Sequence, residues 1–131
     1  MSLDVPTTMI AEAERGEIAD ASFVAVVRES LPYAWQVISS AVTDLELDGT
    51  AQFGEHAVPP PDEHARGELL RALASDSIRG ALERHLGVKL AFQNCHRVAA
   101  FRPEAVGGPA YQEFCSPRAQ VLNQTPELRN C

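Results

Sequence analysis

A cysteine and a histidine stand side by side in the stretch AFQNCHRVAAF, residues 91–101, at Cys95 and His96. A catalytic or redox-sensing thiol needs a nearby base or cation that stabilises its thiolate, and an imidazole can supply either. Neighbouring residues of a strand point to opposite faces, so His96 assists Cys95 only if a turn brings both side chains together. His85, in the helix predicted just before this stretch, is an equally good candidate base. The catalytic candidates are therefore Cys95, His96 and His85.

Two other interpretations of the same cysteine stay open. Free cysteine often behaves as a small buried hydrophobe, so Cys95 can also be a structural residue of a turn. Alternatively, Cys95 and His96 could join Cys115 and Cys131 in a Cys3His set, whose ligand types suit tetrahedral zinc. The three cysteines are separated by nineteen and fifteen residues and form no C-x-x-C motif. This spacing does not select zinc, so we predict no metal site and no cofactor.

A second acidic and histidine-containing set has a simpler explanation than metal binding. His64 and Glu68 are four residues apart on one predicted helical face, but acidic residues at a helix N-terminus already complement the helix dipole. The remaining members of this set are His56, Asp62 and Glu63.

Four arginines of the following helical segment alternate with acidic residues at three- and four-residue separations. This pattern favours a salt-bridged surface over an anion-binding face. The arginines are Arg66, Arg71, Arg79 and Arg84.

Four aromatic residues could line a small-molecule pocket between helices, although sparse aromatics in a helical protein usually belong to its core. They are Tyr33, Trp35, Tyr111 and Phe114.

Length and composition indicate one globular domain, residues 1–131, with 45% hydrophobic and 22% charged residues. The net charge of -7 argues against sequence-independent nucleic-acid binding, which relies on basic side chains. No apolar run is long enough for a membrane span or signal peptide. An odd number of cysteines without a secretion signal points to a reducing, cytoplasmic setting.

Helical periodicity and capping signals predict most of the chain as helix. The N-terminal helices are expected at 7–16, with Thr7 or Thr8 as cap, and at 20–31, with Asp20 or Ser22 as cap.

Pro32 either kinks the second helix or begins the next helix, which extends to about residue 49 with Ser30 near its cap. Residues 61–87 form either one bent helix or two helices divided at Ser75.

A period of two after Gly87 predicts a strand, a tight turn and a strand over residues 88–101. An isolated hairpin is only marginally stable, so it must pack on helices, pair with a further strand or meet another chain. Residues 48–61, with three consecutive prolines, are expected to form a loop, which is the only internal break. Short helices starting near Pro117 and Pro126 complete the prediction. The expected fold class is mainly α (α+β), a single helical domain with one β-hairpin near residues 88–101.

Four segments carry a resemblance that extends over most of the chain. They are LPYAWQVISS, PPPDEHARGELLRALASDSIRGALERH, LAFQNCHRVAAF and LNQTPELRNC. Together they resemble a family of short uncharacterised conserved hypothetical proteins from actinomycete-type bacteria. The resemblance implies a cytosolic bacterial setting and assigns no functional residue.

These observations favour a small cytosolic, non-catalytic interaction or regulatory protein. Its partner would be another protein or a second copy of the chain, meeting it at the hairpin edge or an exposed helical face. The alternatives are a thiol-based enzyme or redox sensor centred on Cys95, and a helical protein that binds a small ligand.

Overall fold

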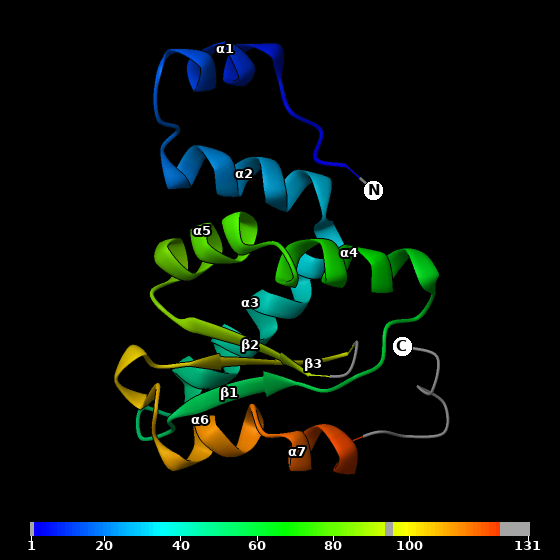
Figure 1. The fold of residues 1–131 in the computed structure, drawn as a ribbon, viewed down its shortest axis with the longest axis vertical. Coiled ribbons are helices and arrows are strands. Elements are labelled where there is room, and N and C mark those ends of the chain that lie inside the picture. The colour runs from blue at the N-terminus through cyan, green and yellow to red at the C-terminus, as the bar shows by residue number, and fades with distance from the viewer. Residues whose placement is uncertain (1, 94–95, 124–131) are drawn as a thin grey trace.

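The computed structural model describes residues 2–93 and 96–123. Its elements follow the chain in the order shown in Figure 1. They are α1 (Thr7–Arg15), α2 (Asp20–Ser30), α3 (Pro32–Leu47), β1 (Phe53–His56), α4 (Glu63–Leu73), α5 (Asp76–Leu86), β2 (Lys89–Gln93), β3 (Arg97–Phe101), a 3-10 turn (Pro103–Ala105), α6 (Pro109–Phe114) and α7 (Pro117–Leu122). The predicted α+β class with a hairpin at 88–101 is confirmed.

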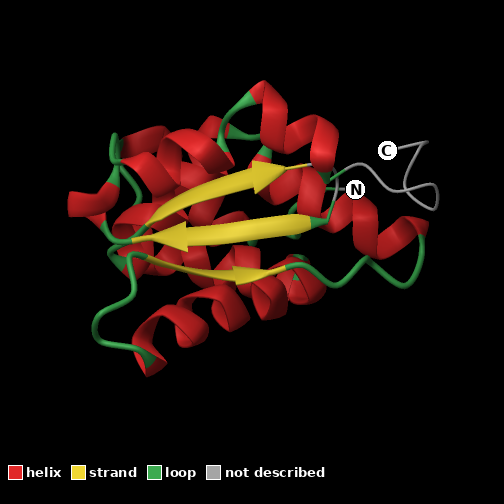
Figure 2. Ribbon diagram, turned by 90° about the horizontal axis from the view of Figure 1, so that it is seen from below, coloured by secondary structure: helices red, strands yellow, loops and turns green. Residues whose placement is uncertain are grey.

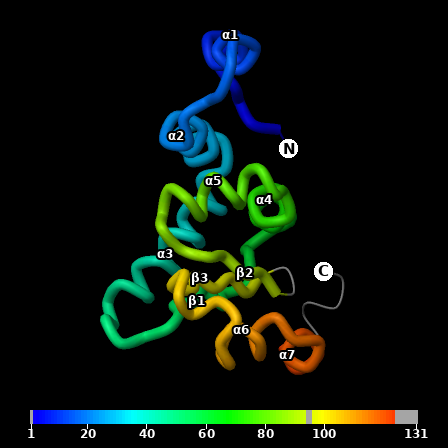
Figure 3. Tube along the Cα trace, turned by 60° about the vertical axis from the view of Figure 1, so that its left-hand side comes forward, coloured from blue at the N-terminus to red at the C-terminus, as the bar shows by residue number. Residues whose placement is uncertain are grey.

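The sheet is antiparallel, with strand order β1-β3-β2, and helices lie on both of its faces (Figure 2). Helices α3, α4 and α5 pack on one face, and α6 and α7 cover the other. Outside α3 and α5 lies α2, and α1 lies beyond α2 at the end of the molecule farthest from the sheet (Figure 3).

Both faces of the sheet are apolar, which explains the nearly continuous hydrophobic run of the hairpin. Alternate strand residues belong to two separate clusters. Leu90, Val98 and Ala100 join the core of α2–α5, whereas Ala91, Ala99 and Phe101 pack with Phe114 of α6.

The prediction of a loop throughout residues 48–61 was wrong, because Phe53–His56 forms β1 on the free side of β3. Phe53 is opposite Phe101, and His56 is opposite Val98. A four-residue strand containing glycine is too short to show a period of two. It becomes a strand because β3 offers an unpaired edge, which also satisfies the hairpin's need for a further partner.

Helix α3 crosses β1 at Gly54 with its backbone almost in contact with the strand. A Cβ atom at position 54 would lie 2.4 Å from the carbonyl oxygen of Ala41 and 2.4 Å from the amide nitrogen of Leu45. These two atoms belong to consecutive turns of α3, so no side-chain rotation could relieve the clash. Glycine is therefore required at this crossing.

Charged side chains from distant segments cap both ends of α3. At the N-terminus, buried Glu68 of α4 accepts hydrogen bonds from the amides of Tyr33 (2.9 Å) and Ala34 (3.4 Å). At the C-terminus, the Arg102 guanidinium donates to the carbonyl oxygens of Leu45 (3.2 Å) and Asp48 (3.2 Å). The anion at the N-terminus and the cation at the C-terminus both complement the helix dipole.

Some predicted helix boundaries are confirmed and others are wrong. Residues 61–87 form two helices, capped by Asp62 and Ser75, and the second ends at Gly87 in the left-handed conformation.

The predicted side-chain caps of the first two helices are absent, because Pro6 and Ala19 occupy the N-cap positions. Pro32 begins α3, but Ser30 does not cap it; its hydroxyl accepts the Asp4 amide instead.

At the C-terminal end, Ser116 caps α7 through the amide of Ala119, as the Ser-Pro pair predicts. The helix expected near Pro126 lies outside the described residues. Within residues 2–93 and 96–123, no helix is long and apolar enough to cross a bilayer.

We predict that Gly54→Ala lowers the free energy of unfolding by about 3 kcal/mol or more, because the new methyl group forces the backbones of α3 and β1 apart. Gly49→Ala is the matched control, since a Cβ there meets nothing within 4 Å. Urea unfolding followed by circular dichroism measures both variants. Equal midpoints for the two would contradict the close crossing.

Candidate functional site

An apolar groove lies between α1 and α2 and has a volume of about 360 Å³. Six of its seven lining residues are hydrophobic. They are Val5, Met9, Ile10, Ala13, Ile18 and Phe23, with Glu14 as the charged member. A surface of this composition fits apolar side chains better than a polar small molecule.

Helix α1, which forms one wall of this groove, is weakly attached to the rest of the protein. It has nine residues, no side-chain cap and no buried residue, and Ile10 is 48% exposed. Helices this short are marginal in water unless tertiary packing supports them. In the described part of the segment before α1, the Asp4 amide donates to the Ser30 hydroxyl (2.9 Å) and Leu3 packs against the core of α2–α5.

The surface around the groove is acidic. Residues 2–20 contain five acidic residues and one basic residue, Arg15. Asp20 is paired with Arg84 of α5 at 2.7 Å, and this contact lowers the pKa of the Asp20 carboxyl. Within the described part of the chain, Glu12, Glu14 and Glu17 have no basic side chain within salt-bridge distance. Their charges are available to a partner.

The thiol hypothesis depends on Cys95, which lies outside the described residues, so it stays a prediction. His96 is only 7% exposed, and its Nδ1 is buried with no hydrogen-bond partner among the described residues. Burial is the main cause that lowers the pKa of His96, and the electrostatic effect of its neighbours Arg97 and His56 acts in the same direction. The imidazole is therefore neutral near pH 7, where it can accept a proton but cannot stabilise a thiolate as a cation.

The structure does not bring His85 to His96. His85 is exposed in the last turn of α5, shortly before β2 begins, whereas His96 follows the end of β2. A strand of five residues spans about 13 Å, so the two imidazoles lie near opposite ends of β2. The side chain of His85 lines a separate cavity beside Trp35 and Arg28.

Three of the four arginines of α4 and α5 form ion pairs, two of them within their own helix and the third with α2, whereas Arg71 has no ion pair within the described residues. The pairs are Arg66 with Glu63 (2.8 Å), Arg79 with Asp76 (2.6 Å) and Arg84 with Asp20 (2.7 Å).

The four aromatic residues lie in two clusters and do not line a common pocket. Tyr33 and Trp35 pack on the core of α2–α5, whereas Tyr111 and Phe114 contact Phe101 on the opposite face of the sheet. A small-ligand site built from all four is therefore not supported by the arrangement.

Only some of the potential metal ligands lie in the part of the chain that the structure describes. Within residues 2–93 and 96–123, no three His, Cys, Asp or Glu side chains are grouped so that they could hold a metal ion. His64 Nε2 lies 3.4 Å from Glu68 Oε2, but the other oxygen of this carboxylate caps α3. Cys115 is an exposed thiol at the end of α6, and Cys131 lies outside the described residues.

Sequence reasoning assigned no function to the segment that forms the groove. The feature of the sequence that points to this segment is the spacing of Val5, Met9 and Ala13, which places apolar side chains at four-residue intervals. Such spacing normally indicates a helix packed on a core. Only the structure shows that the apolar side of α1 lines an open groove.

A family model described as NucS shadow ORF matches residues 1–131, so the chain belongs to this family. The description names a reading frame and states no activity, and it therefore assigns no role to any residue. No curated protein and no solved structure matches the chain.

We predict that acidification destabilises the protein through His96. Because the folded state lowers the pKa of this imidazole, the unfolded chain takes up the proton first, and the stability contributed by neutral His96 is lost as the pH falls below about 6.5. NMR titration of the imidazole resonances, assigned with His96→Gln, should give His96 a midpoint below 6.5. A midpoint at or above 6.5 would contradict the buried, neutral state.

Proposed function

We propose that this chain is a small cytosolic interaction protein that binds a basic amphipathic helix of a partner protein in the groove between α1 and α2. One observation carries the proposal. It is an apolar groove with an acidic surround, bounded by a helix that has no buried residue of its own. Helix-in-groove recognition uses this combination of an apolar channel and charged flanks.

The apolar lining supports a helix as the occupant. A helix presents side chains at i, i+3, i+4 and i+7 along one face, and this row can follow the channel between α1 and α2. Met9, Ile10 and Phe23 would contact that row. Since α1 is weakly held, it can move to fit side chains of different sizes.

Charge indicates which helix fits. The unpaired carboxylates of Glu12, Glu14 and Glu17 attract lysine or arginine residues on the flanks of a bound helix. A second copy of this chain would bring the same acidic surface to the groove, and the like charges would repel. Charge complementarity therefore favours a basic partner over self-association at this site.

The edge of the hairpin is a less favourable place for a partner to bind. At the exposed edge of the sheet, the backbone amide of Leu90 in β2 already donates to Glu83 Oε2 at 2.8 Å. The Glu83 carboxylate also lies 3.4 Å from Lys89 Nζ. A side chain that occupies an edge amide and places charge beside it discourages the addition of another strand.

We predict that a fluorescein-labelled 15-residue peptide with a leucine stripe and flanking lysines binds the protein. Ile10→Asp should weaken binding about tenfold or more, because it places a carboxylate among the apolar contacts. Leu47→Asp is the matched control, since Leu47 is 81% exposed at the end of α3, away from the groove. Fluorescence anisotropy measures both variants, and circular dichroism confirms that they remain folded.

A peptide with glutamate in place of every lysine tests the role of charge and should bind much more weakly. Two results would overturn the proposal. One is equal affinity of the parent protein and Ile10→Asp for the basic peptide, and the other is equal loss in Ile10→Asp and Leu47→Asp. A mass that doubles with concentration in light scattering, and returns to that of a monomer in Ile10→Asp, would instead assign the groove to self-association.

A further inference from the structure

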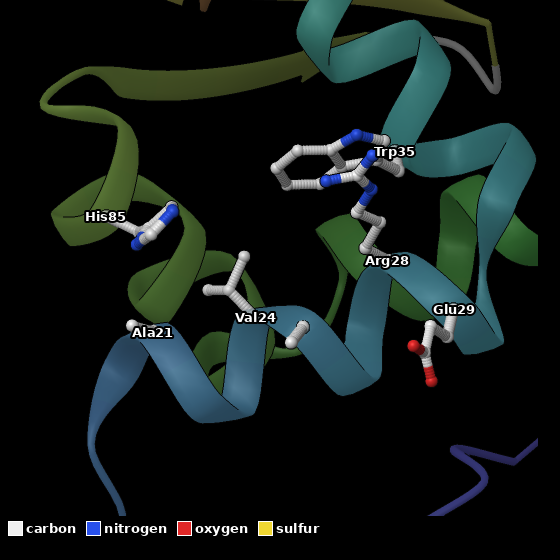
Figure 4. Close-up of a pocket in the computed structure, with 7 residues that line it drawn as sticks. Ala21, Val24, Arg28, Glu29, Trp35 and His85 are labelled. Atoms are coloured by element: carbon white, nitrogen blue, oxygen red, sulfur yellow. The ribbon is translucent and has the colours of Figure 1, made fainter.

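A second cavity, of about 460 Å³, lies between α2, the start of α3 and the end of α5 (Figure 4). One face of α2 lines it through residues three or four positions apart, and Trp35 and His85 complete it. The α2 residues are Ala21, Val24, Ala25, Arg28 and Glu29. This volume falls within the range of small-molecule sites, about 300–1,000 Å³. The groove between α1 and α2 shares none of these residues.

The exposed side chain of Arg28 contacts an aromatic ring and not an acid. Its guanidinium carbon lies 5.6 Å from the centroid of the Trp35 ring. No acidic side chain of the described residues lies within salt-bridge distance of Arg28. Glu29 is its neighbour in sequence, but Figure 4 shows the Glu29 carboxylate directed away from the guanidinium.

A guanidinium placed over a ring still has its N–H groups to offer to another partner. The five N–H groups lie in the plane of the group, and an arginine can direct two of them at the two oxygens of a carboxylate. The contact with the ring also restricts the side chain, which lowers the entropy lost on binding. Arg28 is therefore prepared to bind an anion that enters the cavity.

The rest of the cavity suits a flat apolar group. Figure 4 shows His85 across the cavity from Trp35 and Arg28, with Val24 between them at the base. Ala21 and Ala25 have small side chains, which leave the base open. An aromatic ring could lie over these side chains between the indole and the imidazole.

We propose that this cavity binds a small aromatic carboxylate. The carboxylate pairs with Arg28 and the ring lies over Val24 and Ala25, between Trp35 and His85. This site is independent of the helix-binding groove, and either can exist without the other.

Trp35 is the only tryptophan of the chain, so its indole N–H cross-peak in a ¹H–¹⁵N spectrum reports directly on the cavity. We expect 2-naphthoate to shift this cross-peak in a saturable manner. The neutral analogue 2-naphthamide has the same ring, and its dissociation constant should be about tenfold higher or more, because it lacks the charge that Arg28 recognises.

Two variants and a control distinguish the site from general surface binding. Arg28→Gln should raise the dissociation constant of 2-naphthoate about tenfold and should remove the preference over 2-naphthamide. Ala25→Leu fills the exposed base of the cavity and should weaken both compounds. Arg118→Gln, at an exposed arginine of α7, should change neither. Equal affinity for the two compounds, no saturable shift, or unchanged binding in Arg28→Gln would each overturn the proposal.

Discussion

The crossing of α3 over β1 is the constraint on which the rest of the structure depends. At Gly54 the strand lies so close to the backbone of the helix that position 54 cannot carry a side chain. Glu68 and Arg102 then fix the two ends of α3 from segments 35 and 57 residues away from the groups they contact. These interactions link α4, β1 and β3 to one buried helix, so the sheet and the helices on this face are positioned by α3.

This arrangement divides the described chain into a tightly packed body and one weakly attached helix, α1. Helices α2–α5 share a core in which residues such as Ile38, Leu69 and Leu82 are fully buried, whereas α1 buries none. Regions with few buried apolar contacts open at low free-energy cost and commonly take part in binding. The groove lies at the boundary, lined by α2, which packs on this core, and by α1, which has no buried residue.

Local signals in the sequence predicted several helices and the hairpin. They did not predict the structure that depends on contacts between segments far apart in the chain. Helix periodicity and the division at Ser75 located α5, and the change of period after Gly87 located the hairpin. Strand β1 was missed because four residues become a strand only through pairing with β3. The sequence places Glu68 four residues after His64 on one helical face, and no local pattern shows that it faces the N-terminus of α3. Adjacency drew attention to Cys95 and His96, but the thiol hypothesis stays a prediction.

Amide hydrogen exchange with mass spectrometry tests most directly whether α1 is weakly attached to the core of α2–α5 and forms a binding groove with α2. In the free protein, amides of α1 should exchange far faster than those of α3. Adding the basic leucine-striped peptide should slow exchange in α1 and the adjoining part of α2 and leave α3 unchanged. Protection of α1 equal to that of α3 in the free protein, or peptide-induced protection confined to other elements, would contradict a weakly held helix that forms a binding groove.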